Sequence, residues 1–147
     1  MKKPILFLGI IVSALACKTP QNISNSYHSP MVKQELIDDL TFKIDHYSTD
    51  KTYGYTKNNP VMVGGESEGP KNERRFLNAL AGPNGEEISY YRVGSCCSFK
   101  TKNSSFGGGA LDIYSISYEG LNESLTLYIN MYDSDTLRVP VGLKLRE

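Results

Sequence analysis

The sequence has no tryptophan, only two histidines and no excess of either charge. Lys and Arg balance Asp and Glu at 16 each, so the clustered basic surface of a nucleic-acid-binding protein is not indicated. His28 lies in a polar stretch and His46 in an expected strand. Because we read both as ordinary residues rather than ligands, we predict no metal site and no cofactor.

A long apolar run is also missing. Residues 5–15 are almost all apolar, but a helix that spans a membrane needs roughly 20 such residues. The run follows Lys2 and Lys3 and ends in Ala14-Leu15-Ala16-Cys17, which is the order of an export signal. This junction resembles the lipobox of bacterial lipoproteins, which implies cleavage before Cys17 and acylation of its thiol. The alternative is ordinary signal cleavage that leaves Cys17 free.

We therefore expect residues 1–16 to be a signal peptide and residues 17–30 to be an acylated cysteine with a flexible tether. The tether is polar and poor in large aliphatic residues, as linkers commonly are. By resemblance to Gram-negative lipoproteins, Lys18 after the cysteine favours the outer membrane. We expect the chain to be lipid-anchored in the cell envelope and to face the periplasm.

Residues 31–147 match one domain in size, for which ~100–150 residues is common. The spacing of Val32, Leu36 and Leu40 predicts a short helix over 31–40. A second and main helix is predicted over 71–81, with Asn72 as its N-cap. Gly82 is expected to end this helix as a left-handed cap.

The rest of the domain has strand patterns. A strand is expected over 42–47, where Phe42, Ile44 and His46 alternate with other residues. Later segments are rich in β-forming residues and separated by Gly, Asn and Ser; they cover 88–93, 95–100, 111–118, 125–132 and 137–145. Together these patterns predict an α+β domain, in which an antiparallel β-sheet of about six strands carries one main helix.

Four segments together resemble a family of short Gram-negative lipoproteins over nearly the whole domain. They are Tyr53-Gly54-Tyr55-Thr56 with Asn59-Pro60 and Val63-Gly64-Gly65, then 73–80 with 82–86, Gly94-Ser95-Cys96-Cys97 with Phe99, and 127–133. Members often carry the label 2-dehydro-3-deoxyphosphooctonate aldolase, so the resemblance implies that activity as one alternative. Enzymes of that kind resemble (β/α)₈ barrels of ~250 residues, and this chain is shorter, with one main helix expected.

Cys96 and Cys97 are neighbours and are the remaining thiols once Cys17 is acylated. Adjacent Cα atoms lie ~3.8 Å apart, whereas disulfides usually span ~4.4–6.8 Å. Three interpretations stay open: a strained vicinal disulfide with a redox or ligand-binding role, two separate thiols, or part of a soft-metal site.

Further candidates are weaker. Tyr114, Tyr118, Tyr128 and Tyr132 are expected to lie on one sheet face, either open to an envelope protein or glycan partner or covered by the helix. Arg74-Arg75 becomes of interest if Asp112 or Asp133 pairs with it, and Asp133-Ser134-Asp135 is read as a solvated turn rather than a calcium loop.

No set of catalytic residues can be assembled from the sequence. We therefore predict a membrane-anchored binding or structural domain without catalytic residues. The alternative functions are a thiol-redox or thiol-ligand protein and the aldolase.

Overall fold

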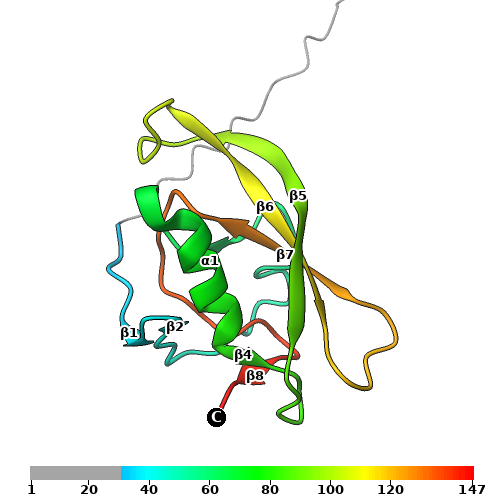
Figure 1. The fold of residues 1–147 in the computed structure, drawn as a ribbon. Coiled ribbons are helices and arrows are strands. Elements are labelled where there is room, and N and C mark those ends of the chain that lie inside the picture. Colours follow the sequence, from blue (N-terminus) through cyan, green and yellow to red (C-terminus); the bar gives the residue numbers. More distant parts are fainter. Residues whose placement is uncertain (1–30) are drawn as a thin grey trace, which may run out of the picture.

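The computed structural model describes residues 31–147, so the expected signal peptide, Cys17 and the tether lie outside the described part. The predicted α+β class is confirmed, with one α-helix and a mostly antiparallel set of strands (Figure 1). The elements in chain order are β1 (Leu36–Asp38), β2 (Thr41–Phe42), β3 (Val61–Met62), the 3-10 helix η1 (Glu66–Glu68), α1 (Gly69–Asn78), β4 (Leu80–Ala81), β5 (Ser89–Lys100), β6 (Gly108–Ser117), β7 (Leu125–Asn130) and β8 (Lys144–Leu145).

The main sheet has four strands rather than the six expected. Its order is β3-β7-β6-β5, with β3 parallel to β7 and the other neighbours antiparallel. The two strands predicted over 88–93 and 95–100 are one strand, β5, because irregularities in register between Arg92 and Gly94 and between Cys96 and Phe99 let it continue. The strand predicted at the C-terminus is reduced to β8, which pairs with β4, because the chain turns at Pro140 and at Gly142, whose φ is +92°.

Helix α1 covers one face of this sheet (Figure 1). It begins at Gly69, about one helical turn earlier than an Asn72 cap would allow, and Pro70 stands in its first turn. Gly69 lies against Met131, and a Cβ at this position would lie 2.7 Å from the Met131 sulfur, so a larger residue would require the Met131 side chain to shift. The predicted N-cap is therefore wrong. Asn72 is instead buried inside the helix and donates to the Gly64 carbonyl oxygen at 3.1 Å.

The predicted C-terminal cap is also wrong. The helix ends at Asn78 with Ala79 in a right-handed conformation, and Gly82 is not among the residues with positive φ. The chain after Ala79 extends directly into β4, whose Leu80 and Ala81 are buried. Pairing with β8 satisfies the backbone there, so no left-handed turn is required.

The helix predicted over 31–40 is replaced by a hairpin of β1 and β2, which lies beside α1 (Figure 1). Asp38 accepts a hydrogen bond from the Leu40 backbone N–H at 2.8 Å, which favours a turn over a helix. The turn is held to α1 because Arg75 Nε donates to the Asp39 carbonyl oxygen at 2.9 Å and Asn78 Nδ2 donates to that of Leu40 at 2.9 Å. The apolar spacing did not mark a buried face, since Leu36 and Leu40 are exposed.

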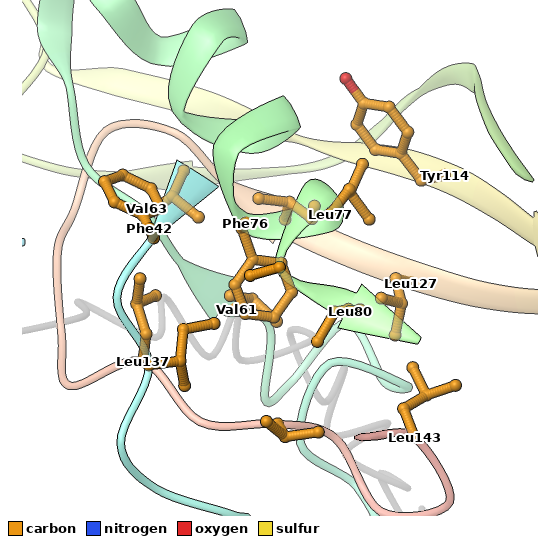
Figure 2. Packing of buried hydrophobic residues seen from close by; sticks show 14 of the residues in the cluster. Phe42, Val61, Val63, Phe76, Leu77, Leu80, Tyr114, Leu127, Leu137 and Leu143 are labelled. Carbon is orange, nitrogen blue, oxygen red and sulfur yellow. The ribbon is translucent and has the colours of Figure 1, made fainter. Parts of the chain in front are cut away.

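The hydrophobic core lies between α1 and the sheet, and Figure 2 shows its packing from close by. Alternation in β7 predicted this correctly, because Leu127 and Ile129 are completely buried. Within residues 31–147, no helix has the length and apolar character needed to cross a bilayer. The buried members of the cluster are Phe42, Ile44, Tyr53, Val61, Val63, Phe76, Leu77, Ala79, Leu80, Tyr114, Ile116, Leu127, Ile129, Leu137, Val139 and Leu143.

Candidate functional site

The four tyrosines predicted to share a sheet face are divided between two faces. Tyr114 pairs in register with Leu127, and Tyr128 pairs with Ile113. Directly paired residues of neighbouring strands point to the same side, so Tyr114 faces the core with Leu127 while Tyr128 faces away from it. The prediction of a single tyrosine platform is therefore wrong.

The other two tyrosines also have separate surroundings. Tyr118 packs against the edge of the core cluster, close to Gly82. Tyr132 lies over Gly109 and makes an edge-on contact with Phe99, with ring centroids 6.0 Å apart.

Cys96 and Cys97 are bonded to each other as a vicinal disulfide. They lie in β5, the edge strand of the main sheet, where the register with β6 becomes irregular. Cys97 is exposed and has a φ of +58°. Among the described residues, 31–147, it is the one non-glycine residue with a positive φ. Of the three interpretations left open by the sequence, the structure has the disulfide.

A cleft of about 430 Å³ opens between α1 and the β5–β6 hairpin. This volume lies within the ~300–1,000 Å³ of typical small-molecule sites. The register puts Tyr90 and Arg92 of β5 on the helix-facing side, since they pair with Ile116 and Tyr114. The residues that line the cleft are Pro70, Arg74, Tyr90, Tyr91, Arg92, Asp112, Tyr114 and Met131.

One wall of the cleft is a paired arginine and carboxylate. Arg92 donates to Asp112 through two nitrogens, Nε at 2.7 Å and Nη2 at 2.8 Å. Ser95 Oγ donates to the same carboxylate at 2.8 Å and also contacts Arg92. Burial alone would raise the pKa of Asp112, but the hydrogen bonds from Arg92 and Ser95 outweigh it and lower that pKa. Asp112 is thus held ionised and its charge is balanced by Arg92.

Beneath this wall lies a second carboxyl group, Glu73 of α1, which is completely buried. The Tyr114 hydroxyl donates to its Oε2 at 2.9 Å. In Figure 2 the Tyr114 hydroxyl points away from the other labelled core residues. The second carboxyl oxygen of Glu73, Oε1, has no donor among the described residues. An ionised Glu73 would therefore be poorly solvated, which is costly inside a protein.

The pKa of Glu73 is accordingly raised to about 7. Burial is the largest cause, and the charge of Asp112 is the next. Asp112 also favours the protonated form by accepting its hydrogen bond, whereas Tyr114 and Arg92 oppose the shift. Near neutral pH, Glu73 therefore exchanges its proton beneath a cleft whose other acid, Asp112, stays ionised.

The two arginines of α1 have different partners from those considered in the sequence. Arg75 is buried and bonds to Asp39 at 3.2 Å and Glu68 at 3.1 Å. Arg74 is exposed beside the cleft, and within 31–147 it has no ion pair. Neither arginine pairs with Asp112 or Asp133, so the condition under which Arg74-Arg75 would be of interest is not met within 31–147.

Asp133 does not belong to a solvated turn, because it is only 1% exposed. Its Oδ1 accepts from Thr101 at 2.5 Å and Asn103 at 2.8 Å, and its Oδ2 accepts from Asn130 at 2.9 Å. These donors fix the loop after β5 to the end of β7. They also occupy the oxygens that a cation would need, and no metal-binding group of three or more His, Cys, Asp or Glu residues occurs within 31–147.

Comparison with known proteins does not add to this geometry. No family model, functionally characterised protein or solved structure matches the chain. The resemblance to short lipoproteins therefore stays a prediction.

Sequence reasoning missed Glu73 and Arg92. Glu73 could have been found, because it precedes Phe76 by three residues and Leu77 by four and so shares their face of the helix. A glutamate on the apolar stripe of a helix must be buried with a partner. Arg92 carried no such signal, since its place opposite Asp112 depends on the register of β5 against β6.

Proposed function

We propose that this protein is a lipid-anchored protein of the bacterial envelope whose domain binds a ligand in the cleft between α1 and the β5–β6 hairpin. The leader and the lipobox-like junction at Cys17 support the anchor, and Lys18 favours the outer membrane with the domain facing the periplasm. The resemblance to short Gram-negative lipoproteins agrees with this placement. The lipid on Cys17 would then hold the protein to the membrane, while the cleft would bind a small component of the envelope.

The cleft is the observation that carries the binding function. It combines apolar surface from Pro70 and Met131 with the charged groups of Arg74, Arg92 and Asp112. Apolar walls with a few placed polar groups are the usual composition of ligand sites. Its arginines come from α1 and β5, two regular elements that are fixed by the core, so the site is formed before any ligand arrives.

Binding fits the two acidic groups better than catalysis does. The Asp112 oxygens already accept from Arg92 and Ser95, and Glu73 is covered on all sides. The aldolase implied by the resemblance would need a (β/α)₈ barrel, whereas residues 31–147 form a four-stranded sheet with one α-helix.

The anchor is tested by metabolic labelling. Cells that express the chain in the presence of labelled palmitate should give a labelled protein in the outer-membrane fraction, while Cys17→Ser should remove the label. Absence of label from the unaltered chain would contradict the anchor.

Binding in the cleft is tested by an NMR screen of small neutral and charged compounds. Shifts should gather at Tyr90, Tyr114 and Met131, and a screen without any shift there would count against the binding function.

A second candidate is a thiol-redox function at Cys96 and Cys97, favoured by the disulfide on an exposed edge strand. A dithiol reductant would transfer two electrons and two protons to the bond, leaving two thiols and becoming a disulfide itself. The positive φ of Cys97 is costly for a residue with a side chain, and reduction would free the backbone to relax.

Mass spectrometry without reductant should show this dipeptide two hydrogens lighter than the dithiol and resistant to alkylation. After treatment with a dithiol it should take up two alkyl groups. Alkylation of both cysteines before any reduction would contradict the redox role.

A further inference from the structure

We infer that the cleft between α1 and β5–β6 binds a small organic anion with an apolar ring, whose negative group is held by Arg74 and Arg92. This inference rests on the proposed binding function and names its ligand class. It follows from the charges that remain in the cleft once the internal pairs have been counted.

Asp112 does not present a free negative charge to a ligand. Its side chain is only 6% exposed and is bound through two nitrogens of Arg92. The Arg92 side chain is 49% exposed, and its third nitrogen, Nη1, makes no hydrogen bond in the described part of the chain. The outer edge of this guanidinium is therefore available to a second acceptor.

Arg74 adds a positive charge that is not balanced by an ion pair within 31–147. With Glu73 protonated, the cleft carries the charges of Arg74, Arg92 and Asp112, which leave one positive charge in excess. A single carboxylate or similar anionic group complements this charge, and guanidinium groups bind such groups with paired hydrogen bonds.

The rest of the cleft suits an apolar ring. The hydroxyls of Tyr90 and Tyr114 are engaged inside the protein, with Asn78 at 2.7 Å and with Glu73 at 2.9 Å. Their rings make an edge-on pair with centroids 6.1 Å apart. The cleft is thus lined by ring carbons, together with Pro70 and Met131, and these surfaces favour an aromatic or other flat ring.

Glu73 makes this binding dependent on pH. The groups that act on it are Asp112 and Tyr114 from β6 and Arg92 from β5, while Tyr90 and Arg74 line the cleft above it. Among the carboxyl groups here, Asp112 stays ionised and Glu73 titrates near neutral pH. Ionised Glu73 removes the excess positive charge, so an anion should bind more weakly as pH rises through about 7.

The test compares 2-naphthoate with its neutral counterpart 2-naphthamide by calorimetry and NMR, using the mature chain that the proposal implies, residues 17–147, with Cys17→Ser so that neither leader nor lipid requires detergent. At pH 6, naphthoate should bind at least about tenfold more tightly, because a hydrogen-bonded charge contributes on this scale. Arg74→Gln should remove this preference. Arg146→Gln is the matched control, because it removes an exposed arginine that pairs with Glu87 away from the cleft, and it should keep the preference.

The outcomes separate the ligand class from the binding function. Equal binding of the two compounds, with shifts at Tyr90 and Met131, would overturn the inference that the ligand is an anion, while the cleft would remain a binding site. Absence of any shift with either compound would overturn the inference of a ring-bearing anion. The NMR screen of small neutral and charged compounds would then show whether the cleft binds any ligand. Without any further substitution, naphthoate should bind at least about twofold more weakly at pH 8 than at pH 6. Glu73→Gln should abolish this change, and its persistence would overturn the role given to Glu73.

Discussion

Replacing Phe76 with alanine should lower the free energy of unfolding by about 3–5 kcal/mol, the usual cost of removing a buried phenylalanine ring. Phe76 is completely buried at the centre of the cluster that joins α1 to the sheet (Figure 2). Because domains of this size are stable by about 5–15 kcal/mol, the variant should retain only part of its stability. Urea denaturation followed by far-ultraviolet circular dichroism measures the difference.

Phe106→Ala is the matched control for this change. The same side chain is removed, but Phe106 is 97% exposed in the loop between β5 and β6. Its loss should change the free energy of unfolding by no more than about 0.5 kcal/mol. Similar losses in the two variants would mean that α1 does not pack on the sheet through Phe76.

The fold class could be predicted because its signals are local. Alternation in β7 identifies Leu127 and Ile129 as the buried face, and the apolar stripe of α1 identifies Phe76 and Leu77. The number of strands could not be predicted, because β5 continues through Gly94 with local irregularities in register that no periodicity of the sequence reveals. The parallel pairing of β3 with β7 joins segments far apart in the sequence, so its partner cannot be read from either segment.

The predicted ends of the helix were wrong because other elements of the fold pack against its residues. Asn72 has the side chain of an N-cap, but its amide is used inside the fold by Gly64 and Arg75. The true start is Gly69, where Met131 packs closely against the first turn, a contact that only the folded chain provides. Local capping rules predict such sites less well where another element packs against the terminus.

The candidate site was predicted in part. The cysteine pair was singled out correctly as adjacent thiols, and the disulfide was one of the alternatives. The tyrosine face was wrong because it grouped residues of neighbouring strands without their register. Tyr114 and Tyr128 occupy opposite faces once Tyr114 pairs with Leu127. The charged layer of the cleft likewise depends on register, since Arg92 meets Asp112 across two strands.

Replacing Glu73 with glutamine should stabilise the protein relative to the unaltered chain above neutral pH. The glutamine can accept from Tyr114 and donate toward Asp112, as protonated Glu73 does, but it cannot ionise. The raised pKa of about 7 means that folding favours the protonated carboxyl. This contribution to stability is complete below the ordinary pKa of 4.5 and is lost as pH rises to about 7.

The expected size follows from the two pKa values. The difference between 4.5 and about 7 corresponds to roughly 3 kcal/mol, since each unit of pKa represents about 1.4 kcal/mol. The difference in unfolding free energy between Glu73→Gln and the unaltered chain should therefore be flat below pH 4.5, grow in favour of the variant up to about pH 7 and then level off. Urea denaturation of both proteins between pH 4 and pH 9 measures this curve, and the other carboxyl groups cancel in the difference.

Glu87→Gln distinguishes a buried acid from a glutamate in general. The Glu87 side chain is 78% exposed and its partner Arg146 is also exposed, so the substitution should alter stability by less than about 0.5 kcal/mol at any pH in this range. A Glu73→Gln curve as flat as this control would show that Glu73 is solvated or fully paired in the folded protein. The polar layer beneath the cleft would then lack the proton on which the pH dependence of anion binding rests, although Arg74 and Arg92 would still offer their charge.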